Sequence, residues 1–205
     1  MAPAITTTTT TTLALTALLT LTTALPAPSL LPRQSNNNAP CFLPGSNPLP
    51  AEVSAIATTL ASSITCSSTR TTLSGVPDVT SGSISFSSID FSQAEGNGQS
   101  PLAFALETFA TPEPLADADL QTFEDELDVY LATEAGVRSV GGALAIKVPK
   151  FFLQMQVSRI QTAQGNPPAA PGLQVDHLRD KVIKNAAGED QALLDQVVAL
   201  AAQLD

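Results

Sequence analysis

The chain has few of the side chains from which catalytic and sugar-binding sites are usually built. Its 205 residues include no tryptophan, one tyrosine (Tyr130), one histidine (His177) and two cysteines. Carbohydrate sites usually stack sugar rings on aromatic faces, so the shortage of these residues argues against them. A Ser-His-Asp or Cys-His arrangement would have to use His177, and no G-x-S-x-G motif is present.

Motifs for metals and cofactors are missing as well. His177 lies in the sequence VDHLRDK, where Asp180 follows at helical spacing, but two ligands do not make a zinc site. The acidic run DADLQTFEDELD at 117–128 lacks the central glycine of a calcium loop. No glycine-rich phosphate loop stands between a strand and a helix. We therefore expect no metal and no cofactor, and we expect His177 on a helix surface.

Basic residues are scarce, with nine lysines and arginines against 19 aspartates and glutamates and a net charge of −10. Such a charge opposes binding to nucleic acid or to an anionic membrane. The uncharged run LALTALLTLTTAL at 13–25 has thirteen residues, which is too short to cross a bilayer. The sequence predicts neither a nucleic-acid partner nor a transmembrane segment.

The same run has the length of the hydrophobic region of a signal peptide. Ala24 and Thr22 are the small residues that a signal peptidase accepts, which predicts a signal peptide over 1–24, although no basic residue precedes the run. Residues 25–33, LPAPSLLPR, then indicate a short pro-segment that is trimmed at Arg33, before Gln34.

This leader, pro-segment and Arg-Gln junction resembles the front of small secreted proteins of filamentous fungi. The resemblance covers about the first 34 residues and concerns processing alone. It implies an extracellular location, and it carries no activity and no functional residue.

Two cysteines in a secreted chain predict one disulfide, between Cys41 and Cys66, with two free thiols as the alternative. Closing this loop would stabilise the fold by about 3 kcal/mol through the unfolded state. The bond would hold 34–49, an irregular arm rich in Asn and Pro, to the end of the first helix. Residues 50–205 are long enough for a single globular domain.

Apolar residues recur at helical spacing in four segments. The last two segments, separated by Gly188, should form a helical hairpin, and Gly136 should end the longest helix. The predicted helices are 50–66, 115–135, 175–186 and 194–204.

Four other segments alternate apolar and polar residues, which is typical of strands. In the first segment the alternation shifts by one residue at Ser87 and Ser88, so we expect either a β-bulge or a break there. The polar stretch 67–78 is predicted to be a connection between the first helix and the first strand. The predicted strands are 81–93, 100–109, 144–148 and 151–157. Together these elements indicate an α+β fold, a small antiparallel sheet packed with about four helices, and the alternative is a mostly α fold.

Charge is segregated along the chain. Twelve of the 19 acids lie between Arg70 and Arg138, where no basic residue occurs, whereas 138–184 holds seven basic residues against two acids. One interpretation is weak surface pairing between the two segments. The other is an acidic patch that recognises a cation or a basic partner, for example at a cell-wall or host surface.

Three functions are consistent with these features. We favour a small secreted non-enzymatic protein that acts at a cell surface or on a host. The second is a binding module for an apolar small ligand, in a cavity lined by Phe86, Phe91, Phe104, Phe151 and Met155, although core packing would also explain these residues. The third is a hydrolase that uses either His177 or two carboxylates, for which Glu124 with Asp128 or Glu126 with Asp119 can be named.

Overall fold

The computed structural model describes residues 39–96 and 98–205, and these described residues belong to one compact unit. The predicted signal peptide at 1–24, the pro-segment at 25–33 and the first part of the arm lie outside the described residues. Among the described helices, none is long and apolar enough to span a membrane.

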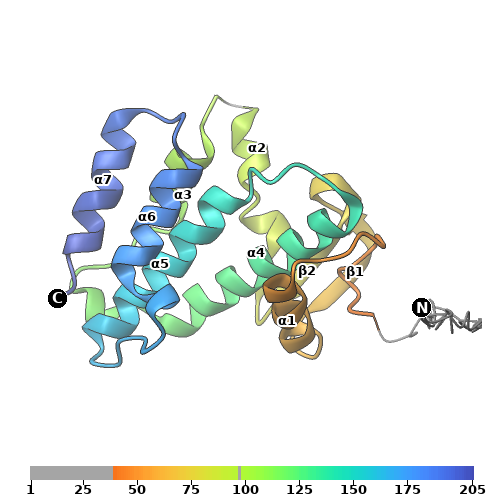
Figure 1. Ribbon diagram of the computed structural model, residues 1–205, viewed down its shortest axis with the longest axis horizontal. Helices are drawn as coiled ribbons and strands as arrows, with labels where there is room; N and C mark the ends of the chain where they lie inside the picture. Colours follow the sequence, from red (N-terminus) through yellow and green to blue (C-terminus); the bar gives the residue numbers. More distant parts are fainter. Residues whose placement is uncertain (1–38, 97) are drawn as a thin grey trace, which may run out of the picture. The chain divides into compact units, whose positions relative to one another are not determined.

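The α+β prediction is confirmed, because a small three-stranded antiparallel sheet packs with seven α-helices in the described residues (Figure 1). The strands are β1 Thr65–Thr71, β2 Pro77–Ser81 and β3 Ile84–Ser85. The helices are α1 Ala51–Leu60, α2 Phe91–Glu95, α3 Pro101–Thr108, α4 Leu120–Val140, α5 Lys147–Ala163, α6 Val175–Asn185 and α7 Gln191–Ala202.

The sheet has the order β1-β2-β3, and half of its strand residues come from the stretch 67–78 that we predicted to be a polar connection. Thr65 pairs with Thr80 and Cys66 with Val79, before an irregularity in β1. β1 is an edge strand of Ser and Thr, most of it exposed, so it carries no apolar alternation. The prediction of a connection at 67–78 was therefore wrong for 67–71 and 77–78, while 72–76 does connect β1 to β2.

The strand predicted at 81–93 breaks where its alternation shifts. Ser81 ends β2, Ile84–Ser85 forms β3, and the 3-10 helix Phe86–Ser88 and then α2 follow it. The break, rather than the β-bulge, was therefore the correct alternative. The strand predicted at 100–109 is wrong, since α3 occupies it. Ser100 caps α3 by accepting a hydrogen bond from the amide of Ala103, and Pro101 follows in the first turn.

The strands predicted at 144–148 and 151–157 are also wrong, because α5 spans all of 151–157 and begins at Lys147, after a turn at 145–146. α5 packs against α3, α4 and α6, as Figure 1 shows at the centre of the helical part. A helix enclosed on several sides buries apolar residues around most of its circumference, so a single apolar stripe is not visible in its sequence. Phe152, Leu153, Met155 and Ile160 are all fully buried.

The helix predicted at 115–135 is α4, but it starts five residues later and continues through Gly136 to a left-handed cap at Gly141. The predicted hairpin of α6 and α7 is confirmed. The first helix ends at Leu60, well before Cys66.

The disulfide between Cys41 and Cys66 is present, with 6.0 Å between the Cα atoms. It fastens the arm to β1, and not to the end of the first helix as predicted. Beyond it the arm lies on the carboxyl end of α4: the amide of Gly45 donates to Ser139 Oγ at 3.0 Å, and that of Asn47 to the Ser139 carbonyl at 2.9 Å. Phe42, a residue of the arm itself, is fully buried.

Candidate functional site: a basic cleft

A cleft with a cavity volume of about 400 Å³ lies among α1, α4, α5, α6 and the segment before α6. Most of its apolar lining comes from helical residues that also pack in or against the core, while Leu173, in the segment before α6, is exposed. The apolar residues are Val53, Ile56, Leu131, Phe151, Leu173 and Leu178.

Basic side chains surround this apolar surface. Five of the eight basic residues that follow Arg33 line the cleft, together with the single histidine. The only acids among the lining residues are Glu52 and Glu134. The basic residues are Arg138 on α4, Lys147 and Lys150 on α5, and Lys181 and Lys184 on α6.

Helical spacing explains why these residues converge. His177, Lys181 and Lys184 follow one another at four and three residues on α6, so they share one face. Lys147 and Lys150 lie one turn apart at the start of α5. Because α5 packs between α4 and α6, these faces meet at one cavity.

Glu134 organises one wall of the cleft. It is buried, and its Oε1 accepts hydrogen bonds from Arg138 while its Oε2 lies 2.9 Å from Lys150 Nζ. Burial raises the pKa of Glu134, but the charges and hydrogen bonds of Lys150 and Arg138 outweigh it and hold that pKa below its ordinary value. Lys150 Nζ also lies 3.9 Å from the ring centre of Phe151. One carboxylate thus fixes two cations, and the group keeps one net positive charge.

The other three lysines have no such partner. In the described residues, Lys147, Lys181 and Lys184 form no ion pair with a carboxylate. Asp176 and Asp180, which share α6 with Lys181 and Lys184, pair with Arg179, which does not line the cleft. The cleft therefore carries an excess of positive charge in a protein whose net charge is −10.

A model of the protein family described as "Domain of unknown function (DUF7143)" matches residues 43–205. The chain belongs to this family. No curated protein and no solved structure matches the chain. All residues that line the basic cleft fall inside the DUF7143 domain, as does Cys66, while Cys41 lies just before it.

The apolar cavity that we predicted for the second function is not formed by the five residues named for it. Only Phe151 lines the basic cleft. Phe86, Phe91 and Met155 are buried in the core of the DUF7143 domain, and Phe104 packs against that core. Phe86 and Phe109 contact Tyr130 edge-on, with ring centres 5.0 and 5.7 Å apart. Core packing was the correct alternative for four of the five.

The carboxylates named for a hydrolase lie on α4 and at its start, away from the basic cleft. Burial raises the pKa of Glu126 to about 7. Burial, and then the charges of Asp125 and Glu124, raise the pKa of Asp128 to about 6. The described part of the DUF7143 domain holds no group of three or more His, Cys, Asp or Glu side chains that could bind a metal ion.

His177 is exposed on α6, and it lines the basic cleft. Sequence reasoning placed it on a helix surface and assigned it no role. The convergence of the lysines with it was missed as well. The signal was the excess of basic residues at 138–184, together with the four- and three-residue spacing on α6.

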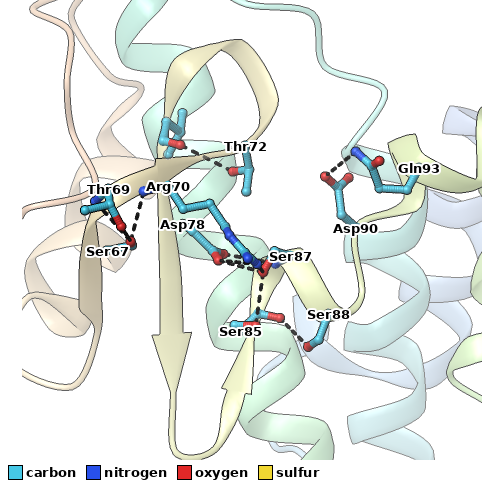
Figure 2. A network of polar contacts seen from close by, with 11 residues as sticks. Ser67, Thr69, Arg70, Thr72, Asp78, Ser85, Ser87, Ser88, Asp90 and Gln93 are labelled. Carbon is cyan, nitrogen blue, oxygen red and sulfur yellow. Dashed lines mark hydrogen bonds and ion pairs between the residues drawn. The ribbon is translucent and has the colours of Figure 1, made fainter.

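A second polar cluster, shown in Figure 2, ties the edge of the sheet together. The amide and hydroxyl of Ser87 donate to Asp78 at 3.0 and 2.6 Å, and Arg70 donates to the Ser87 hydroxyl at 2.9 Å. Asp78 is buried, whereas Arg70 is exposed. The cluster lacks a histidine, and its bonds hold the 3-10 helix after β3 against β2. We assign it a structural role.

Proposed function

We propose that this protein is a small secreted, non-enzymatic binding protein whose basic cleft captures an anionic molecule with an apolar part. The observation that carries the proposal is the cleft itself. Five of the eight basic residues after Arg33 gather there, although the chain is strongly acidic. Weak pairing between the acidic and basic segments does not account for this arrangement, because Lys147, Lys181 and Lys184 form no ion pair in the described part of the chain.

Charge supports an anionic ligand. Lysines that face one cavity repel one another, and an anion bound between them relieves that repulsion. The acidic surface elsewhere repels anions, so the cleft is where the local field would draw one in. Arg138 and Lys150 are already held in place by Glu134, so a ligand need not order them.

The shape of the cleft supports a ligand that also has an apolar part. Its volume of about 400 Å³ falls in the range of small-molecule sites. Phe151 and Leu131 are half-buried, and they offer apolar surface beside the cations. A molecule with a phosphate, sulfate or carboxylate head and a hydrocarbon or ring body would satisfy both surfaces.

The leader at 1–24 and the disulfide support binding outside the cell, where disulfides persist. A secreted protein of this kind would act at a cell surface or toward a host by capturing such a molecule. The basic cell-wall or host partner suggested by the acidic segment stays a separate prediction.

The fluorescent probe 8-anilinonaphthalene-1-sulfonate tests the proposal, because it joins a sulfonate to an apolar ring system. The chain has no tryptophan, so its own fluorescence will not mask the signal. We expect saturable binding by the folded protein, weakened about tenfold when Lys147→Gln and Lys181→Gln are combined.

Arg179→Gln is the matched control, since Arg179 is a cation on α6 that does not line the cleft. It should leave the affinity unchanged. Equal probe binding by the double lysine variant and the wild type, or no saturable binding at all, would overturn the proposal.

A further inference from the structure

A second cavity, of about 530 Å³, lies on another side of α5. Arg159 follows Lys150 by nine residues, which puts the two side chains on opposite faces of the helix. The cavity is bounded by the end of α3 and the loop after it, by α5, and by the end of α7. Its principal lining residues are Leu106, Thr111, Leu115, Arg159, Leu200 and Gln203.

Arg159 is the largest fully buried side chain in the described residues, with 2% of its surface exposed. Its Nη1 donates to Gln156 Oε1 at 2.6 Å and to Thr111 Oγ1 at 3.5 Å. Its Nη2 and Nε donate to the carbonyl of Gln203, at 2.9 and 3.3 Å. Every one of these acceptors is neutral.

The guanidinium of Arg159 therefore forms no ion pair in the described residues. No carboxylate of residues 39–96 or 98–205 lies within 4.0 Å of it. Burial lowers the pKa of Arg159, yet an arginine side chain stays charged in proteins. A buried charge is ordinarily paired, because leaving it unpaired is costly. Gln156 is fully buried. Its Oε1 accepts from Arg159, and its Nε2 donates to the Phe109 carbonyl.

We propose that this cavity, the Arg159 pocket, binds the carboxylate of a small monocarboxylic acid with an apolar body. A carboxylate can accept from the free N–H of Nη2 and replace the long contact between Nη1 and Thr111. Leu106, Leu115 and Leu200 supply apolar walls for the body of the ligand.

The rim of the pocket sets the charge of the ligand. Glu113 and Asp205 line the same cavity, and both are exposed. Their negative charges repel a second anionic group, so the pocket selects a singly charged acid. The basic cleft is lined by five cations, so it favours a ligand with more negative charge. The two sites are thus distinct, and this inference does not rest on the proposed function.

A purely structural role for Arg159 would be to hold the end of α7 on α5 through the Gln203 carbonyl. That role calls for no ligand, so the test must detect binding directly. A titration of the ¹⁵N-labelled full chain with octanoate, followed by NMR, reports binding residue by residue, with octanol as the uncharged control of the same length.

Octanoate should produce saturable shifts at the amides of Thr111 and Gln203 and at the Arg159 side-chain N–H, with a Kd of about 1 mM or lower. Octanol should bind at least about tenfold more weakly. Asp205→Asn should tighten octanoate binding about twofold by removing one rim charge. Arg159→Lys should weaken it about tenfold, and Lys181→Gln should leave these shifts unchanged.

Equal shifts with octanol, octanoate shifts confined to residues of the basic cleft, or no saturable shift at all would each overturn the inference. Arg159→Lys could also fail to fold, since the side chain is buried. Leu200→Trp is a second test that keeps Arg159 in place. Its larger side chain fills the pocket from α7 and should block octanoate binding. Octanoate shifts at Thr111 that persist in the folded Leu200→Trp variant would overturn the inference as well.

Discussion

Glu126 has a strongly raised pKa, and its surroundings explain the shift. Its Oε2 is buried and has no hydrogen-bond partner in the described residues. An ionised carboxylate without a donor is poorly solvated there, so burial raises the pKa of Glu126 to about 7. Asp128, one turn from Asp125 and Glu124, has its pKa raised to about 6 by burial and by those charges.

The sign of the effect on stability follows from these directions. In the unfolded chain Glu126 ionises near its ordinary pKa of 4.5, whereas the folded protein holds that proton until about pH 7. The folded state binds more protons across this window, so the free energy of unfolding falls as the pH rises through it. Asp128 acts in the same direction, from about pH 4 to about pH 6.

Glu126→Gln should therefore stabilise the protein at pH 8 and change little at pH 4, because the amide cannot ionise. We expect a gain of about 1 kcal/mol at pH 8, less than the full shift implies because the side chain is partly exposed. Urea unfolding at the two pH values measures it. Glu95 is exposed, so the control variant Glu95→Gln should leave the free energy of unfolding unchanged at both pH values. A loss of stability at pH 8 in Glu126→Gln would contradict this account.

At the scale of elements, the arm packs closely on α4 where glycines replace larger side chains, and Gly136 is one of these positions. A Cβ at Gly136 would collide with the carbonyl oxygen of Phe42 and with the side chain of Val76. The glycine lets α4 approach the arm closely, which explains why it sits inside the helix instead of ending it.

Gly136→Ala should destabilise the fold by about 2 kcal/mol, since backbone and a buried valine must move apart. Gly188→Ala is the control, because a Cβ there meets nothing within 4 Å. It should be neutral or slightly stabilising. The shift of the unfolding midpoint in urea compares the two variants, and equal stability in both would show that the arm does not press on α4 at Gly136.

Helices that show a stripe on one face were predictable, and those enclosed by neighbours were not. α4, α6 and α7 each followed from apolar residues at helical spacing. α5 is buried on several sides, so its apolar residues fit two periodicities and the strand was preferred. In α3 the alternation of Leu102, Phe104 and Leu106 favoured a strand, and the helix start formed by Ser100 and Pro101 was missed.

The candidate site was only half visible in the sequence. The excess of basic residues at 138–184 could be read directly, and so could the shared face of Lys181 and Lys184. Their meeting with Arg138 and Lys147 depends on how α4, α5 and α6 pack, and no local pattern encodes that packing. The Arg159 pocket was invisible for the same reason, because burial of an arginine follows from tertiary contacts.

At the scale of the whole molecule, the central feature is that acidic and basic residues lie in different places. Acids dominate the chain and much of α4, while most of the few basic residues face the basic cleft. Glu134 neutralises only part of that charge. A protein with this distribution should bind an anionic amphiphile and discriminate against a neutral one of the same length.

The most direct measurement is isothermal titration calorimetry of the full chain with dodecyl phosphate and, in parallel, with dodecyl maltoside, both below their micelle concentrations. We predict binding of one dodecyl phosphate at the basic cleft, and markedly weaker binding of the uncharged maltoside. Raising the salt concentration from about 0.1 M to about 1 M shortens the screening length from about 10 Å to about 3 Å. The affinity for dodecyl phosphate should therefore fall several-fold. Equal affinity for both amphiphiles, or an affinity for dodecyl phosphate that salt does not change, would contradict the account.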